Sequence, residues 1–288
     1  MLLKDRNIII TGASLGFGTA IAEEFVREGA SLLLCARNFD PLETLAIRLN
    51  KISRDGQIVV AKTCDVSKED DVYQLISEAL KIFPHIDGLV NNAGVYGPLG
   101  PIQSLNWEEW KEAIQINLFG TVFPSRLILP HFLNRHSGKI VNLSGGGATN
   151  PLPRISAYAA SKAAVVRFTE TLAEEVKGCG IDINAIAPGV LDTRLTQQIL
   201  KAGPDIVGNK LFNRISSLSV KSEESIHKGA KLCAYLCSSE SDGISGKLIA
   251  ALWDPWPKLH DFKKILNDTD IYTLRRIIPK DRGQDWGE

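Results

Sequence analysis

The sequence predicts an α/β fold in which helices cover both faces of one doubly wound, parallel β-sheet. Two observations lead to this prediction: short apolar runs alternate with longer amphipathic runs, and most of the apolar runs are nearly continuous. Continuous apolar strands separated by helices are typical of a parallel sheet that is buried on both faces. Right-handed crossovers between such strands place a ligand cleft at their carboxyl ends.

Seven short runs are expected to form the strands. The first consists of three consecutive isoleucines and the second contains three consecutive leucines, whereas later runs mix branched apolar residues with small ones. Such residues suit a pleated, buried surface. In chain order the expected strands are 8–10, 31–36, 58–63, 88–91, 138–143, 182–187 and 247–252.

Longer amphipathic runs between the strands carry apolar residues at helical spacing. The expected helices are 17–28, 40–53, 67–83, 104–135, 156–178 and 222–238. No repeat, low-complexity segment or long linker divides the chain, so we expect one domain over 1–253 and a C-terminal extension over 254–288.

The region 190–220 carries no clear strand and contains Gly203, Pro204 and Gly208. A long insertion after the carboxyl end of a strand is where a substrate lid would lie. We therefore expect a lid here in preference to a surface excursion without a role.

About 35 residues follow Trp253. Leu259, Phe262, Ile265 and Leu266 are predicted to share one face of a helix, and such apolar residues need a surface to bury against. Packing on the parent domain is the first interpretation. The alternative is an arm that crosses a subunit interface or covers the substrate pocket.

Composition narrows the functional classes. Hydrophobic residues make up 44% of the 288 residues, and the formal net charge is zero, so no overall attraction to nucleic acid or to an anionic membrane is implied. No apolar run approaches a membrane span of about 18 residues, and residues 1–6 leave no room for a signal peptide before the first strand. Five scattered cysteines form no metal pattern and favour a reduced, cytoplasmic protein.

A glycine-rich turn lies between the first strand and the first helix. It reads Thr-Gly-Ala-Ser-Leu-Gly-Phe-Gly over 11–18. In a strand–turn–helix context the glycines let the backbone approach a pyrophosphate, while the helix N-terminus offers unpaired N–H groups to the anion. The turn is a candidate dinucleotide-phosphate site.

Two further motifs accompany this turn. Asn-Asn-Ala-Gly occupies 91–94, after the fourth strand, and Tyr158 and Lys162 stand one helical turn apart in Tyr-Ala-Ala-Ser-Lys. The three motifs, in this order and spacing, resemble the short-chain dehydrogenase/reductase family in its compact, single-domain branch. The resemblance runs from about Lys4 to Trp253 and implies a Rossmann-like fold and an NAD(P)-dependent oxidoreductase.

The resemblance also implies a set of cofactor-binding residues. They belong to the glycine turn, the ends of the second, third and fourth strands, the tyrosine–lysine helix and the segment after the sixth strand. They are Gly12, Ser14, Leu15, Gly16, Phe17, Gly18, Arg37, Asn38, Asp65, Val66, Asn92, Ala93, Gly94, Tyr158, Lys162, Pro188, Gly189, Val190 and Thr193.

The end of the second strand indicates which dinucleotide is preferred. NAD-selective relatives usually carry an acidic residue there, whereas this chain has Ala36 followed by Arg37. Loss of the carboxylate removes repulsion toward a 2′-phosphate, and a guanidinium can pair with that phosphate. The sequence predicts NADP(H) in preference to NAD(H).

Four catalytic residues follow from the resemblance: Tyr158 as acid/base, Lys162 as the cation that lowers the tyrosine pKa, Asn117 in support of a proton path, and Ser144. Asn117 could instead serve only as a backbone partner at a helix kink. The family serine that contacts the substrate oxygen most often stands thirteen residues before the tyrosine, which here is Gly145. Either Ser144 turns into the site, or Tyr158 and water hold the oxygen, or the chain binds its cofactor without turnover.

The substrate expected from the resemblance is a small carbonyl compound or alcohol. Tyr96, Leu99, Leu152, Ile155 and Leu191 are candidate pocket walls, and Arg154 could attract an anionic group or be only a solvated loop residue. The family also implies a homodimer or homotetramer built partly through 104–135 and 156–178.

Two alternatives to this enzyme stay open. One is a catalytically silent NADP(H)-binding sensor, with the C-terminal extension as its interaction surface. The lesser one is a nucleotide-sugar epimerase or dehydratase, although the larger substrate domain typical of that branch is not evident.

Overall fold

The computed structural model describes residues 1–54, 56–189, 191, 194–217 and 222–286. Seven strands in this part of the chain form one parallel sheet in the order β3-β2-β1-β4-β5-β6-β7. The order reverses between β1 and β4, where a doubly wound sheet opens its ligand cleft. The strands are β1 (Asn7–Thr11), β2 (Ser31–Ala36), β3 (Val59–Thr63), β4 (Gly88–Asn91), β5 (Gly138–Leu143), β6 (Ile181–Ala187) and β7 (Leu248–Ala250).

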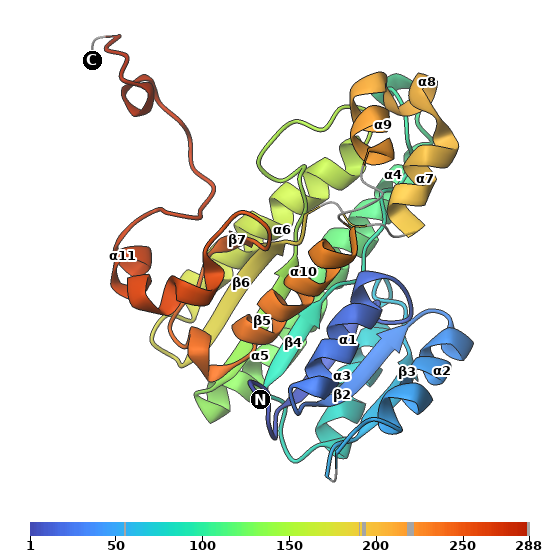
Figure 1. Cartoon of the computed structure of the whole chain (residues 1–288), viewed down its shortest axis with the longest axis vertical. Helices are drawn as coiled ribbons and strands as arrows, with labels where there is room; N and C mark the ends of the chain where they lie inside the picture. Colours follow the sequence, from blue (N-terminus) through green and yellow to red (C-terminus); the bar gives the residue numbers. More distant parts are fainter. Residues whose placement is uncertain (55, 190, 192–193, 218–221, 287–288) are drawn as a thin grey trace.

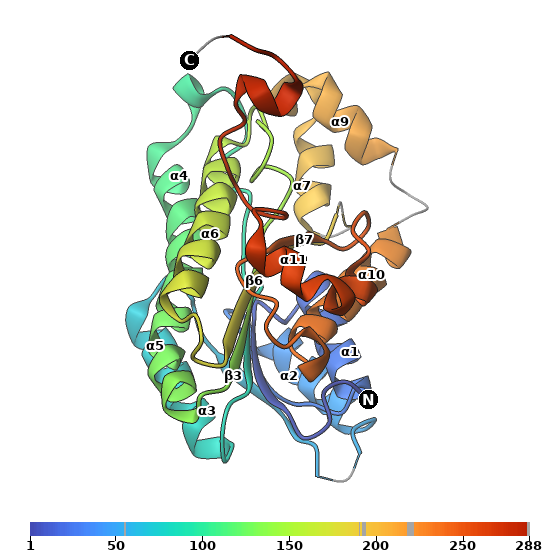
Figure 2. The ribbon, with the colours of Figure 1, turned by 90° about the vertical axis from the view of Figure 1, so that its left-hand side faces the viewer.

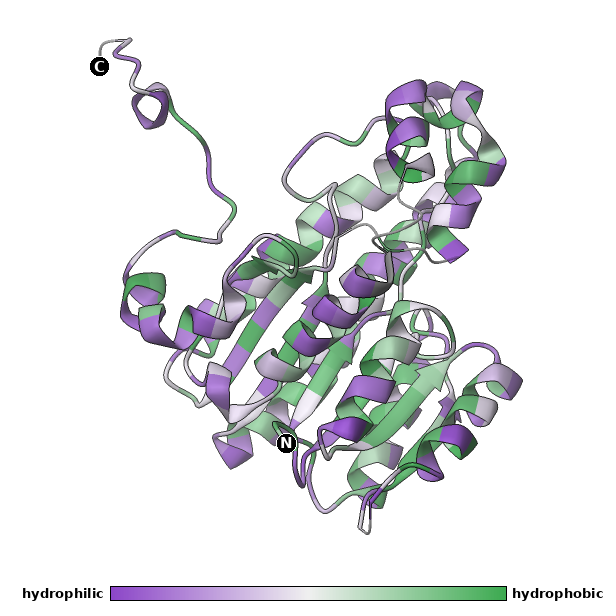
Figure 3. Cartoon of the chain, in the orientation of Figure 1, coloured by the Kyte–Doolittle hydropathy of each residue, from purple (hydrophilic) through white to green (hydrophobic). Residues whose placement is uncertain are grey.

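Helices cover both faces of this sheet, which confirms the predicted fold class (Figures 1 and 2). One face buries apolar residues of α1, α2 and α10, and the other buries those of α3, α5 and α6. Figure 3 shows the strands as a hydrophobic layer beneath helices with polar outer surfaces. The helices are α1 (Phe17–Arg27), α2 (Phe39–Asn50), α3 (Glu69–Ile82), α4 (Trp107–Ile114), α5 (Gly120–Arg135), α6 (Ser156–Glu175), α7 (Arg194–Ala202), α8 (Pro204–Val207), α9 (Asn209–Ser216), α10 (Ser222–Leu236) and α11 (Lys263–Asp268).

The strands form where the sequence predicts them, because their side chains are buried on both faces. All residues of β1, β2, β4 and β5 are buried. Residues Ile8–Ile10 pair in parallel with Gly88–Val90 on one side and with Leu32–Leu34 on the other. This register brings the carboxyl ends of β1, β2 and β4 to the same edge of the sheet.

The helix predicted over 104–135 is not continuous. A short 3-10 turn, η1 (Ile102–Ser104), precedes α4, and a π-helical segment, η2 (Gln115–Phe119), separates α4 from α5. The Asn106 side chain caps α4 by accepting hydrogen bonds from the N–H groups of Glu108 and Glu109. The π turn shifts the helix register at Asn117, a displacement that apolar periodicity does not reveal.

The region 190–220 contributes the helices α7, α8 and α9, which lie beside one another next to the carboxyl edge of the sheet (Figure 1). Ile199, Val207 and Ile215 form their buried apolar centre. Tyr96 and Tyr158 from the main domain pack against this centre. The three helices therefore cover the side of the sheet where the motifs converge.

The first half of the C-terminal extension packs on its own domain. It forms η4 (Trp256–Phe262) and α11, and Leu259 and Leu266 are buried against the core. Phe262 and Ile265 are exposed, so the prediction that all four share one buried face is wrong. A change from a 3-10 turn to an α-helix at Lys263 alters the angular spacing of these side chains.

The extension next crosses the sheet edge and then leaves it. The N–H of Leu248 in β7 donates to the carbonyl of Tyr272, and the N–H of Leu274 donates to Glu170 in α6. Beyond Leu274 the chain projects away from the body through η5 (Pro279–Arg282), as Figure 1 shows.

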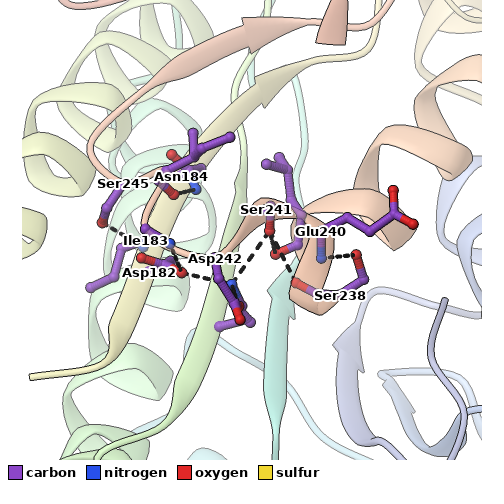
Figure 4. Close-up of polar contacts among 12 residues, drawn as sticks. Asp182, Ile183, Asn184, Ser238, Glu240, Ser241, Asp242 and Ser245 are labelled. Atoms are coloured by element: carbon purple, nitrogen blue, oxygen red, sulfur yellow. Dashed lines mark hydrogen bonds and ion pairs between the residues drawn. The ribbon is translucent and has the colours of Figure 1, made fainter. Parts of the chain in front are cut away.

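A buried polar cluster ties the amino-terminal ends of β5 and β6 to the loop after α10 (Figure 4). Lys139 Nζ lies 2.6 Å from Asp182 Oδ2 and 2.7 Å from Asp242 Oδ1. The Asp182 side chain also accepts a hydrogen bond from the N–H of Gly243. The cluster is at the end of the sheet opposite the glycine turn, and its role is structural.

Candidate active site

One cavity of about 300 Å³ runs along the carboxyl edge of the sheet. It is lined by the β1–α1 turn, by residues after β2 to β6, by α6 and by the helices α7 and α9. All the described residues of the predicted cofactor set line it, from Gly12 to Gly189. Val190 and Thr193 lie outside the described residues.

The glycine turn is clamped against the segment after β4. Thr11 Oγ1 accepts hydrogen bonds from the N–H groups of Asn92 and Ala93, each at 3.1 Å. The Asn92 side chain donates to the carbonyls of Thr11 and Gly12. A Cβ on Gly12 would lie 2.7 Å from Ala93 Cα, and one on Gly18 would lie 2.6 Å from Asn92 Nδ2. The close approach of these two segments therefore requires both glycines.

The residues beside this turn suit a dinucleotide. Helix α1 begins at Phe17 after Gly16, which brings no capping side chain, so its first N–H groups remain available to an anion at the cavity wall. Arg37 and Asn38 follow β2 along the same cavity. The Asp65 carboxylate accepts hydrogen bonds from the N–H and hydroxyl of Ser67, which holds the turn after β3.

Tyr158 and Lys162 face the cavity from α6, one helical turn apart. The Lys162 side chain is only 4% exposed. Its Nζ donates to the carbonyl of Leu143, 2.7 Å away, and lies 5.8 Å from the centre of the Tyr158 ring. The edge of the Tyr96 ring packs against Tyr158 with centroids 4.8 Å apart. The predicted pair is thus brought together at the end of β5.

Burial governs the ionisation of this pair. It raises the pKa of the Tyr158 hydroxyl above its ordinary value, with a smaller contribution from Tyr96, and it lowers the pKa of Lys162 to about 8. The net shift of the Tyr158 pKa is therefore upward, opposite to the direction expected from the spacing of Tyr158 and Lys162, because burial disfavours the phenolate.

The β5–α6 loop approaches α6 so closely that only glycine fits at two positions. A Cβ on Gly145 would overlap the Tyr158 hydroxyl, and one on Gly147 would lie 2.8 Å from Ala159 Cα. Ser144 lies 4% exposed on the cavity wall, and its Oγ has no hydrogen-bond partner among the described residues. A buried hydroxyl without a partner is costly unless a ligand supplies one.

Asn117 is buried behind the cavity and does not line it. Its Oδ1 accepts the N–H of Val95, and its Nδ2 donates to the Val95 carbonyl and to Ser161 Oγ. Ser161 Oγ in turn donates to the carbonyl of Tyr158. The π turn that carries Asn117 therefore joins the segment after β4 to the tyrosine helix.

The predicted pocket walls are found with one exception. Tyr96, Leu152, Ile155 and Leu191 line the cavity, whereas Leu99 packs in the adjoining apolar cluster. Arg154 is not a solvated loop residue, since its Nη1 donates to the carbonyls of Asp205 and Ile206 in α8. The region 190–220, where a lid is expected, supplies wall residues that the sequence analysis did not name, although the i, i+4 pair of Leu211 and Ile215 signals them. These residues are Arg194, Leu195, Thr196, Leu211, Arg214 and Ile215.

Metal and membrane elements are not found in the described part of the chain. No group of three or more His, Cys, Asp or Glu side chains there is placed to hold a metal ion. None of the helices described is both long and apolar enough to span a membrane.

A doubly wound sheet, a glycine turn and a tyrosine–lysine pair on one cavity define a dinucleotide-dependent oxidoreductase site. The family model for short chain dehydrogenases matches residues 6–203. The chain belongs to the short-chain dehydrogenase family.

The relatives extend this assignment. The chain is 37% identical over 202 residues to 11-beta-hydroxysteroid dehydrogenase-like 3 of Arabidopsis thaliana. The match covers 69% of this chain but only 64% of that protein, so slightly less than two thirds of the relative's length is matched. It is 35% identical over 199 residues to L-fucose dehydrogenase of Oryctolagus cuniculus, covering 69% and 67%.

Solved structures of reductases share the fold. Levodione reductase aligns with a TM-score of 0.77 and 28% identity, covering 86% of this chain and 96% of that one. A variant of actinorhodin polyketide ketoreductase solved with NADPH aligns with a TM-score of 0.76 and 27% identity, covering 85% and 95%.

Proposed function

We propose that this protein is an NADPH-dependent oxidoreductase that interconverts a ketone or aldehyde with its alcohol. The observation that carries the proposal is the pair of the partly buried Tyr158 and the buried Lys162, which shares one cavity with the uncapped N-terminus of α1. A bound nicotinamide would supply or accept the hydride. The residues of this chain would bind it, orient the substrate and move the proton.

Tyr158 is proposed as the proton donor to the oxygen of the carbonyl that is being reduced. Burial raises its pKa, so the hydroxyl stays protonated at neutral pH and is ready to act as an acid. The Lys162 ammonium, held by the Leu143 carbonyl, lies on the same side and would offset the negative charge left on the phenolate. Asn117 is proposed as a positioning residue, because it acts through Ser161 and the backbone of α6.

Ser144 is proposed to hold the substrate oxygen. Its buried Oγ has no hydrogen-bond partner among the described residues, and it borders the cavity beside Tyr158. A hydrogen-bond donor that is already in position stabilises the negative charge that develops on the substrate oxygen, because the site does not have to reorganise during the reaction. Ser144 would thus take over the role that Gly145 cannot fill.

Arg37 supports the choice of NADPH. It lines the cavity after β2, next to Ala36, where an acidic residue would repel a 2′-phosphate. The structural relative solved with NADPH agrees with this preference. The proposed contacts of the nicotinamide half are Pro188 and Gly189 on the cavity wall, together with Val190 and Thr193.

The helices α7 to α9 are proposed to form a lid that closes over the substrate. For the assembly we propose a homodimer or homotetramer, as in the family. The cysteines, all free, fit a reducing compartment such as the cytoplasm.

A second candidate function rests on Gly145. Because the family's usual serine is absent there, the chain could bind NADP(H) as a silent sensor. Oxidation of NADPH should be followed by absorbance with a panel of ketones, aldehydes and keto-acyl thioesters. Turnover that is lost in Tyr158→Phe supports the enzyme. NADPH binding measured by calorimetry, without turnover across the panel, favours the sensor.

A further inference from the structure

Several apolar side chains line the cavity where the loop before α6 faces α9. Leu152 and Ile155 come from the loop before α6, and Leu211 and Ile215 come from α9 in the lid. One charged side chain, Arg214, interrupts this wall between the two α9 residues. A cation among apolar walls indicates a specific polar requirement of the ligand.

The charges along the cavity are unbalanced. Among the lining residues that the structure describes, Asp65 is the one carboxylate, and it lies after β3 beside Ser67. The cations are Arg37, Lys162, Arg194 and Arg214. No described residue forms an ion pair with Arg214.

The other three cations have neighbours that account for them. Arg37 follows β2 at the proposed 2′-phosphate position, and Lys162 is held by the Leu143 carbonyl. Arg194 begins α7 directly after the segment 188–193, which resembles the family's nicotinamide-contacting segment. Arg214 alone lies in α9, far along the chain from these motifs.

Arg154 provides a useful contrast. It lies near the same lid, but its guanidinium donates to the carbonyls of Asp205 and Ile206, at 2.8 and 3.0 Å. Those bonds fasten α8 to the loop before α6. Arg154 is therefore a structural fastener, whereas the guanidinium of Arg214 has its donors available to a ligand in the cavity.

The positive charge of Arg214 acts on Tyr96, the aromatic neighbour of Tyr158. Burial raises the pKa of Tyr96, and the positive charge of Arg214 partly offsets that rise. The Tyr96 ring packs edge-on against Tyr158. An anion bound by Arg214 would thus lie on the same cavity as Tyr96 and Tyr158.

We propose that Arg214 binds a carboxylate of the substrate, so that the enzyme selects carbonyl compounds with a short apolar body and a carboxylate at the far end. This inference rests on the proposed reductase function. A guanidinium matches a carboxylate in bidentate geometry, and the exposed Arg214 side chain borders the apolar cavity wall. The family model ends at residue 203, before α9.

The test compares acids with their neutral esters. Benzoylpropionate and benzoylbutyrate, each beside its methyl ester, are reduced with NADPH by the wild type, Arg214→Gln and Lys210→Gln. Lys210 is the matched control, because it is an exposed cation on the same helix that does not line the cavity. For the wild type we expect a kcat/KM at least about tenfold higher for an acid than for its ester, which is the size of one charge-assisted hydrogen bond. Arg214→Gln should remove that preference and leave the ester rates within about twofold, and Lys210→Gln should keep the preference.

Two results would overturn the inference. One is equal kcat/KM for acids and esters in the wild type. The other is an equal loss for both in Arg214→Gln, which would mean that the arginine only stabilises the lid.

A binding measurement separates this inference from the proposed function. Calorimetry with NADP⁺ present follows benzoylpropionate on the wild type and on Arg214→Gln. Binding that Arg214→Gln abolishes, without reduction of any compound, supports the carboxylate site and overturns the reductase. Reduction of esters without acid binding overturns the carboxylate site alone.

Discussion

The hydroxyl of Tyr158 occupies the space that a side chain at Gly145 would need. The position where the family most often has its serine is therefore filled, in this chain, by the acid/base candidate itself. The adjacent Ser144 keeps a buried hydroxyl without a partner among the described residues. Ser144 is thus the hydroxyl that remains beside Tyr158, and this relationship leads to the first two predictions.

Gly145→Ala should displace the Tyr158 hydroxyl from its position in the proposed active site. The added Cβ overlaps the tyrosine hydroxyl, and a displacement of about 1 Å in a reacting group can cost about 100-fold in rate. We expect kcat to fall by about that factor. Gly146→Ala is the steric control, because a Cβ there meets nothing within 4 Å. Equal effects of the two substitutions would contradict the argument.

Ser144→Ala should lower kcat by about 100-fold, the usual effect of removing one oxyanion donor. The melting temperature should not fall, because the substitution removes a buried hydroxyl that has no partner among the described residues. Steady-state kinetics and thermal unfolding together check this pair of outcomes. An unchanged kcat would exclude Ser144 from the site.

Lys162 should set an alkaline limb in the pH profile. Its pKa is lowered to about 8, so the side chain is an ammonium below that pH and a neutral amine above it. Activity that needs the ammonium should decline as the pH rises through 8. The pH dependence of kcat/KM for NADPH, which reports the free enzyme, measures this limb. In Lys162→Arg the charge persists, and a limb that stayed at the same pH would assign it to another group.

Arg37→Ala should change the choice of cofactor. We expect kcat/KM for NADPH to fall at least about tenfold, as for a lost charge-assisted bond, while the value for NADH changes less than about twofold. Lys51→Ala removes an exposed cation after α2 that does not line the cavity and should affect neither value. Parallel losses with both cofactors would argue against a 2′-phosphate contact.

Asp182→Asn should destabilise the fold by about 3 kcal/mol, because it leaves the buried Lys139 ammonium without its closest buried partner. The matched change is Asp242→Asn. The Asp242 side chain is 61% exposed although it lies 2.7 Å from the same ammonium, so its loss should cost less than about 1 kcal/mol. Urea unfolding measures both values, and a larger loss for Asp242→Asn would reverse this assignment.

The strands and the glycine turn could be predicted because their signals are local. Continuous apolar runs identify buried parallel strands, and a strand followed by a glycine turn and a helix determines where the chain must reverse. The tyrosine–lysine pair is equally local, since its spacing is one helical turn. These features converge in the structure because parallel strands end at one edge of the sheet.

The ionisation of the site could not be predicted from spacing. The sequence shows that Tyr158 and Lys162 stand one helical turn apart. The direction of their pKa shifts, however, depends on how much water the surrounding elements remove. The same holds for Arg154. Its role follows from α8, which lies some fifty residues away in sequence and meets it only in the folded chain.

The sequence by itself determined the order of the strands along the chain, the sheet they form and the motifs at its carboxyl edge, since each depends on residues that are neighbours in the chain. Only the tertiary structure decided that Gly145 faces the Tyr158 hydroxyl and that Arg214 reaches the cavity from α9. Such contacts depend on close packing between distant segments, where about one ångström decides whether a side chain fits.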